Sequence, residues 1–230
     1  GVEIVNFIDD HSRLCVASVA VEVTRATDVA EAFAQAIAAY GTPASVLTDN
    51  GCIYTAKHRN GKVVMETLLE SLGVTYKHSS PYHPQTCGKV ERFHQTMKRY
   101  LVRQPGAADL AGLQAQIDRF VAYYNTCRPH RALGRRTPAE AFGAKVKAHP
   151  PLRRAATHFR VRRDKIDKSG RVTLRHDSRL LHIGVGRAHV GTRVLLLVAD
   201  LDVRVVTDEG ELLRELRIDP SRDYQPLGSS

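Results

Sequence analysis

Two carboxylates in this sequence stand in settings that suit metal chemistry, and the first is Asp49. It follows the apolar run Ala44–Leu47, which we expect to form a short buried strand, and it precedes Asn50 and Gly51. Ligands and catalytic groups gather at strand ends, because the strand is rigid while the loop after it is open. Asp-Asn-Gly is also a favoured turn sequence, and taken alone the segment is better interpreted as an Asx-turn.

The second carboxylate, Glu91, lies in a predicted helix whose other charged residues are all basic. A single acid among cations usually forms an ion pair within its helix. A metal-dependent phosphodiester enzyme needs the same combination, because the metal neutralises the reacting phosphate while the cations hold the flanking backbone. Gln95 shares a helix face with Glu91. The helix residues predicted to line a DNA channel are Lys89, Arg92, Gln95, Lys98 and Arg99. A solvated helix surface is an equally good interpretation of Lys98 and Arg99.

The elements that must position these two carboxylates alternate between strand and helix patterns. Two apolar runs, Val2–Ile8 and Leu14–Val23, predict a β-hairpin whose turn holds DDHSR. The later elements are expected as a helix Asp28–Tyr40 capped by Thr27 and Gly41, a strand Ala44–Leu47, a helix Val63–Leu72, a strand Val74–Lys77, a loop 79–87, and helices Gly88–Val102 and Leu110–Asn125. This order predicts an α/β fold with one central sheet.

The pattern changes after a proline-containing, basic segment at 143–156, which is typical of a linker. Short alternating strands are predicted at His158–Arg163, Arg171–Arg175, Leu180–Ile183, Val194–Val198 and Val203–Val206. We therefore expect a core domain at 1–142, a linker at 143–156, and a small all-β barrel domain at 157–225.

The charge distribution indicates a polyanionic partner. The formal net charge is +10, and two segments carry most of the excess: 77–136 has 11 basic and 3 acidic residues, and 151–193 has 12 and 3. Two basic segments predict two contact surfaces for a phosphate backbone. The predicted DNA contacts in the second segment are Arg160, Arg162, Arg163 and Lys165. Their alternation with apolar residues predicts one cationic strand face. Scattered solubilising arginines are a weaker interpretation, because 194–230 is net acidic.

Composition excludes several other classes. The four cysteines are far apart and form no Cys-x-x-Cys pair, so neither a zinc site nor a disulfide framework is expected. No apolar run approaches the roughly 20 residues of a membrane span, and the N-terminus lacks the pattern of a secretory signal. We expect a cytoplasmic protein. Because the chain begins with Gly1, we also expect it to be a piece of a longer reading frame.

Three ordered motifs resemble one family. TDNG at Thr48–Gly51, SPYHPQTCGKVERFHQTMKR at Ser80–Arg99 and YYNTCRPHRALGRRTP at Tyr123–Pro138 resemble bacterial insertion-sequence transposases with a retroviral-integrase-type catalytic core. The resemblance runs from Val2 to about Phe142, and the basic β segment is similar to the carboxy-terminal domain of such transposases. It implies a ribonuclease-H-like core and a triad of two Asp and one Glu that holds Mg²⁺ or Mn²⁺. Asp49 matches the second Asp, and Glu91 matches the Glu.

The chain departs from the family pattern in two ways. Asp49 and Glu91 have 41 residues between them, more than the common family spacing, and the polar stretch 56–62 could loop out to absorb the excess. The first Asp of the family lies on the first core strand, usually shortly after a Trp, and this chain has no Trp. We therefore expect the first catalytic Asp to be absent from the chain. Asp9 and Asp10 are alternative ligands, although a turn role suits them better.

The resemblance implies that the parent protein cleaves and joins DNA, acting on transposon ends and target DNA as a homo-oligomer in the bacterial nucleoid. With one carboxylate missing, we expect this chain to bind metal weakly and to have little or no activity. The alternative is a catalytically inactive, DNA-binding remnant of a transposase. A simple ribonuclease-H-like nuclease is disfavoured by the basic β segment, which such an enzyme does not need.

Overall fold

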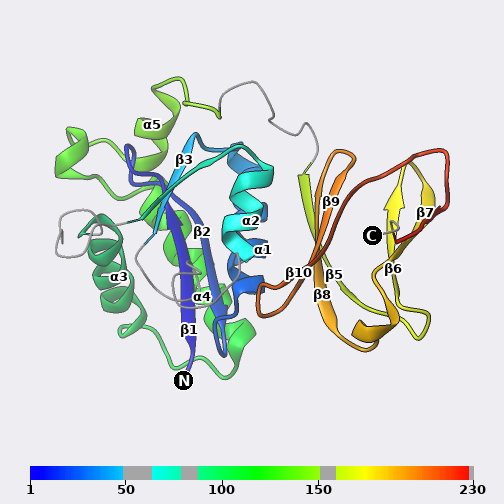
Figure 1. The fold of residues 1–230 in the computed structure, drawn as a ribbon. Helices are drawn as coiled ribbons and strands as arrows, with labels where there is room; N and C mark the ends of the chain where they lie inside the picture. The colour runs from blue at the N-terminus through cyan, green and yellow to red at the C-terminus, as the bar shows by residue number, and fades with distance from the viewer. Residues whose placement is uncertain (49–63, 79–87, 151–158, 228–230) are drawn as a thin grey trace. The chain divides into compact units, whose positions relative to one another are not determined.

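The computed structural model describes residues 1–48, 64–78, 88–150 and 159–227 (Figure 1). The chain divides into two compact units: the first comprises 1–24, 31–50 and 74–150, and the second comprises 25–30, 51–73 and 151–230. Among the described residues, no helix is both long and apolar enough to cross a membrane.

The predicted N-terminal hairpin is present. Strands β1 (Glu3–Ile8) and β2 (Cys15–Val21) pair antiparallel. Asp9 closes the turn: its backbone N–H donates to the carbonyl of Leu14 at 2.8 Å, and its carboxylate accepts from the backbone and hydroxyl of Ser12 at 2.7 and 2.5 Å. Arg13 takes a left-handed φ of 65° in this turn. Asp9 is therefore a turn residue.

The other strand pair of the first unit is parallel. Strand β3 (Ser45–Thr48) pairs with β4 (Thr75–His78), so that Thr48 lies beside His78. In the part of the chain that is described, this pair and the hairpin are separate two-stranded sheets. The prediction of one central sheet is therefore wrong for these residues, because no described strand bonds to both pairs.

Helices cover the strands of the first unit. Helices α3 (Gly88–Leu101) and α4 (Leu110–Thr126) pack against the hairpin. Their shared core contains Cys15, Ala20, Phe93, Met97, Ile117, Phe120 and Tyr124. A short 3₁₀ turn at Arg131–Leu133 follows, and then α5 (Pro138–Gly143). The sequence pattern did not predict α5, although Thr137 and Glu140 form a capping box that marks its start.

Helix α1 (Ala26–Tyr40) begins earlier than predicted. Thr27 lies inside its first turn instead of capping it, and its buried hydroxyl has no hydrogen-bond partner among the described residues. The predicted C-terminal cap is confirmed: Gly41 has a φ of +85°, and its N–H donates to the carbonyl of Ile37 at 2.8 Å. Helix α2 spans Val64–Ser71, close to its prediction.

The second unit is rich in antiparallel strands. Its strands are β5 (Phe159–Lys165), β6 (Arg171–His176), β7 (Arg179–Gly184), β8 (Arg193–Ala199), β9 (Asp202–Thr207), β10 (Leu212–Arg217) and β11 (Tyr224–Gln225). They form one sheet in the order β10-β9-β8-β5 and another in the order β11-β7-β6. Buried Leu174 and Ile183 of the smaller sheet share one core with Leu196 and Val205 of the larger. Strands β10 and β11 were not predicted, and closure into a barrel stays a prediction.

Candidate active site and nucleic-acid interface

Helix α3 is strongly two-sided, and this determines what it exposes. Phe93 and Met97 are buried on the side that faces the hairpin. The predicted functional residues on the other side are all exposed: Glu91, Arg92, Gln95, Lys98 and Arg99. The 3.6-residue period places Glu91, Gln95 and Lys98 along one line of the helix surface. A carboxylate, an amide and an ammonium group are thus presented together.

His94 lies one turn after Glu91, and the sequence motifs did not single it out. Its Nε2 is 3.0 Å from Nδ2 of Asn6 on β1, and the Asn6 Oδ1 accepts a hydrogen bond from Ser18 at 2.6 Å. Because that amide nitrogen is a donor, the His94 Nε2 must accept, which requires a neutral ring. Burial lowers the pKa of His94, the charge of Lys98 lowers it further, and Glu91 opposes both effects. The sequence signal for this contact between His94 and Asn6 was only the position of His94, three residues after Glu91 on the same helix.

Asp49 lies outside the described residues, so its distance to Glu91 is untested. The residue before it, Thr48, ends β3 and shares a 2.8 Å hydrogen bond with the hydroxyl of Tyr76. Because β3 and β4 are parallel, both strands end at the same edge of the pair. Asp49 directly follows β3 in the sequence, and the segment after β4 leads to α3. Within the described ranges, no group of three or more His, Cys, Asp or Glu could hold a metal ion.

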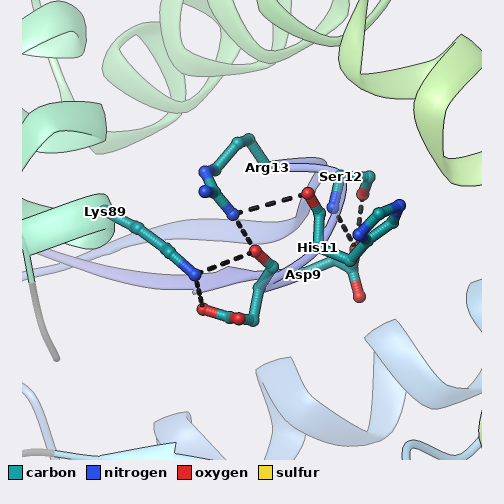
Figure 2. Close-up of polar contacts among 6 residues, drawn as sticks. Asp9, His11, Ser12, Arg13 and Lys89 are labelled. Atoms are coloured by element: carbon teal, nitrogen blue, oxygen red, sulfur yellow. Dashed lines mark hydrogen bonds and ion pairs between the residues drawn. The ribbon is translucent and has the colours of Figure 1, made fainter. Parts of the chain in front are cut away.

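The first turn of α3 is tied to the hairpin turn. The Lys89 ammonium lies 2.5 Å from the Asp10 carboxylate and 3.2 Å from the Asp10 carbonyl. Lys89 from helix α3 and Arg13 from within the turn both donate to the backbone carbonyl of Asp10 (Figure 2). Asp10 is therefore an ion-pair partner of Lys89 here, in keeping with a turn role.

The predicted cationic face of the β segment is not one face. Strand β5 pairs with β8 in unbroken register, so alternate side chains point to opposite sides. Arg160 and Arg162 lie on one side, and Arg163 and Lys165 lie on the other. The prediction failed because Arg162 and Arg163 are adjacent and cannot share a strand face.

Several of these β5 cations already have partners. Arg160 donates to the backbone carbonyl of Arg175. Arg162 donates to the hydroxyl of Thr173 at 3.1 Å. The exposed Lys165 stands at the end of the strand.

The first unit thus combines helices with a parallel strand pair, and Glu91 is exposed on the helix that follows that pair. Two sequence profiles, each described as an integrase core domain, match residues 1–84 and 72–138. Together the two matches span residues 1–138, and this part of the chain resembles an integrase core domain.

The relatives in the comparison are mostly much longer proteins. An uncharacterized protein of Caenorhabditis elegans is 33% identical over 110 residues, covering 47% of this chain and 8% of that protein. The transposase InsD for insertion element IS2 of Escherichia coli is 33% identical over 100 residues, covering 43% of this chain and 31% of the transposase. The chain thus spans less than a third of either relative.

One solved structure resembles nearly the whole chain. A protein chain from the cryo-electron microscopy structure of the simian T-cell lymphotropic virus intasome, in complex with a PP2A regulatory subunit, aligns with a TM-score of 0.50 at 16% identity. The alignment covers 95% of this chain and 78% of that one. At this identity the likeness shows the fold alone, which is that of a retroviral-integrase-like protein.

Proposed function

We propose that this chain is the DNA-joining part of a transposase or integrase: a polynucleotidyl transferase that cleaves and transfers strands at the ends of a mobile element. The observation that carries the proposal is the exposed line of Glu91, Gln95 and Lys98 on α3, within the part of the chain that matches integrase core profiles. A buried or oppositely facing Glu91 could not reach a phosphodiester.

In this proposal Asp49 and Glu91 hold Mg²⁺ or Mn²⁺. Carboxylate oxygens are the ligands that these hard cations prefer, and the exposed Glu91 leaves room for water and phosphate oxygens. A metal held there would supply the Lewis acidity that activates a water or a DNA 3′-hydroxyl and stabilises the leaving oxygen. Lys98, Arg99 and Arg92 hold the phosphates on either side of the scissile bond. The neutral His94 ties α3 to β1 through its hydrogen bond with Asn6, and it adds no charge near the proposed metal site.

The chain offers two of the three carboxylates that the resemblance implies. A catalytically inactive DNA-binding remnant is therefore the second candidate function. Both candidates require DNA binding, and only the first requires strand transfer. The two candidates are therefore distinguished by whether the longer protein that contains this chain transfers DNA strands.

The second contact surface of the proposed interface is the β segment. We propose that 157–225 forms a small barrel-like DNA-binding domain, joined by a linker at 143–156 to a core at 1–142. Exposed cations such as Lys165 would contact phosphates without reading sequence. Two DNA ends must be held together for joining, so we propose a homo-oligomer. A mobile-element function places it with the DNA of its host, in the bacterial cytoplasm if the element is bacterial.

The test is strand transfer by the longer protein on a labelled oligonucleotide of the element's end, with Mg²⁺ or Mn²⁺. The Glu91→Gln variant should lose strand transfer while retaining DNA binding, because the change removes a metal ligand and also a charge that repels phosphate. The matched control is Glu22→Gln, an exposed acid on the hairpin side of the same unit, which should keep full activity. Intact strand transfer by Glu91→Gln would refute the catalytic assignment. DNA binding by an inactive wild-type protein would favour the remnant.

A further inference from the structure

The first unit contains a pocket of about 520 Å³ whose lining does not include Glu91, Gln95 or Lys98. It lies where the hairpin turn, the first turn of α3 and the loop before α5 meet. Three of its lining side chains are cations, Arg13, Lys89 and Arg136, and one is an anion, Asp10. At 36% and 80% exposure, the side chains of Lys89 and Asp10 are open to solvent.

Backbone carbonyls hold the two arginines in place. The Arg13 guanidinium donates to the carbonyl of Asp10, and to that of His11 at 3.4 Å (Figure 2). The Nε of Arg136 donates to the carbonyl of Leu133 at 3.2 Å. A carbonyl orients a guanidinium but does not cancel its charge. Among the described residues, the ion pair that these pocket cations form is Lys89 with Asp10.

A neighbouring histidine lies in the same positive field. His130 stands at the edge of this loop, and its backbone N–H donates to the carbonyl of Arg136 at 3.0 Å. Burial lowers the pKa of His130, and the charges of Arg128 and Arg13 lower it further. Protonation of His130 is therefore disfavoured first by burial and then by these two cations.

We propose that this pocket binds a phosphate of the DNA backbone, and that the Asp10 carboxylate occupies the place of that phosphate until DNA arrives. The proposal rests on the proposed function, because it takes DNA as the partner. A carboxylate and a phosphodiester present similar anionic oxygens to the same ammonium and guanidinium donors. The Lys89–Asp10 pair is exposed and therefore weak, so a phosphate can displace it at little cost.

The test uses the chain as it stands and measures its affinity for labelled double-stranded DNA by fluorescence anisotropy. Asp10→Asn keeps the backbone carbonyl that holds Arg13 and Lys89, and it removes only the competing charge. We expect it to tighten DNA binding by roughly threefold to tenfold. Glu22→Gln removes an equal charge from an exposed site outside the pocket, and should tighten binding by less than about twofold.

A second pair of variants separates the pocket from general electrostatics. Lys89→Gln should weaken binding and lower the log–log salt dependence by about 0.9, the value for one phosphate contact. Arg119→Gln is the control, because Arg119 is an exposed cation on α4. It should change the affinity and the salt dependence less than Lys89→Gln does. In the Lys89→Gln background, Asp10→Asn should no longer tighten DNA binding, because Asp10 then has no ammonium to pair with.

Two results would overturn the pocket proposal while leaving the proposed function intact. The first is an equal increase in DNA affinity from Asp10→Asn and Glu22→Gln. The second is an increase in DNA affinity from Asp10→Asn that persists in the Lys89→Gln background. A wild-type chain that fails to bind DNA would refute the proposed function, and the pocket proposal with it. Circular dichroism melting of each variant confirms that the fold is kept.

Discussion

The side chain of Asn125 pairs with the backbone of Cys15 as a neighbouring strand would. Its Oδ1 accepts from the Cys15 N–H and its Nδ2 donates to the Cys15 carbonyl, both at 2.9 Å. Both residues are buried. The amide thus ties α4 to the first residue of β2, and the Asn of the YYNTCRPH motif has a structural role.

Asn125→Ala should destabilise the first unit. The change leaves a buried N–H and a buried C=O without partners, which costs about 2–4 kcal/mol in the free energy of unfolding. Urea unfolding followed by circular dichroism measures the effect. Thr126→Ala, at the exposed neighbouring position, is the control and should cost less than about 0.5 kcal/mol. Similar values for the two variants would contradict the role given to Asn125.

The stability of the chain should depend on His94 at mildly acidic pH. Burial lowers the pKa of His94 in the folded state, so the unfolded state binds more protons below the ordinary value of about 6.5. Stability is therefore complete above about pH 6.5 and falls as the pH drops toward the folded pKa. His94→Gln should remove part of the stability loss seen between pH 7.5 and 5.5. An unchanged pH dependence in His94→Gln would show that the ring is not held neutral.

Cys15 and Cys127 should differ in reactivity. Burial raises the pKa of Cys15 to about 12, and the residue is 1% exposed, so it forms almost no thiolate at neutral pH. Cys127 is exposed. Brief treatment with iodoacetamide and peptide mapping should find Cys127 modified and Cys15 protected until urea is added. Early modification of Cys15 would show that the contact between α4 and β2 opens readily.

The two sides of β5 should contribute unequally to DNA binding. Lys165→Glu should weaken binding more than Arg162→Glu, because the Arg162 guanidinium lies 3.7 Å from the Asp164 carboxylate while Lys165 is exposed at the strand end. The Lys165 variant should also lower the log–log salt dependence by about 0.9 for each phosphate that the lysine no longer neutralises. Equal effects from both variants would mean that the DNA does not distinguish the two sides.

Local patterns predicted the elements well. The apolar runs indicated the hairpin, and the 3.6-residue period indicated α3 and α4 within one or two residues. What they could not indicate was pairing over distance: Asn6 with His94 spans 88 positions, and Cys15 with Asn125 spans 110. Strand β10 was missed because its charged residues interrupt the apolar pattern, and α5 was missed because its six residues are too few to show a period.

The most direct test of the proposed function asks whether Asp49 and Glu91 hold the same metal ion. Mn²⁺ affinity of the DNA-bound chain can be measured by electron paramagnetic resonance for the wild type, Asp49→Asn, Glu91→Gln and the double variant. Each single change should weaken binding by roughly tenfold or more, since each removes a ligand. The double variant should then lose little beyond either single change, because one shared site is already broken. Fully additive losses, or no loss in one of the single variants, would contradict a shared metal site and with it the catalytic role proposed for Glu91.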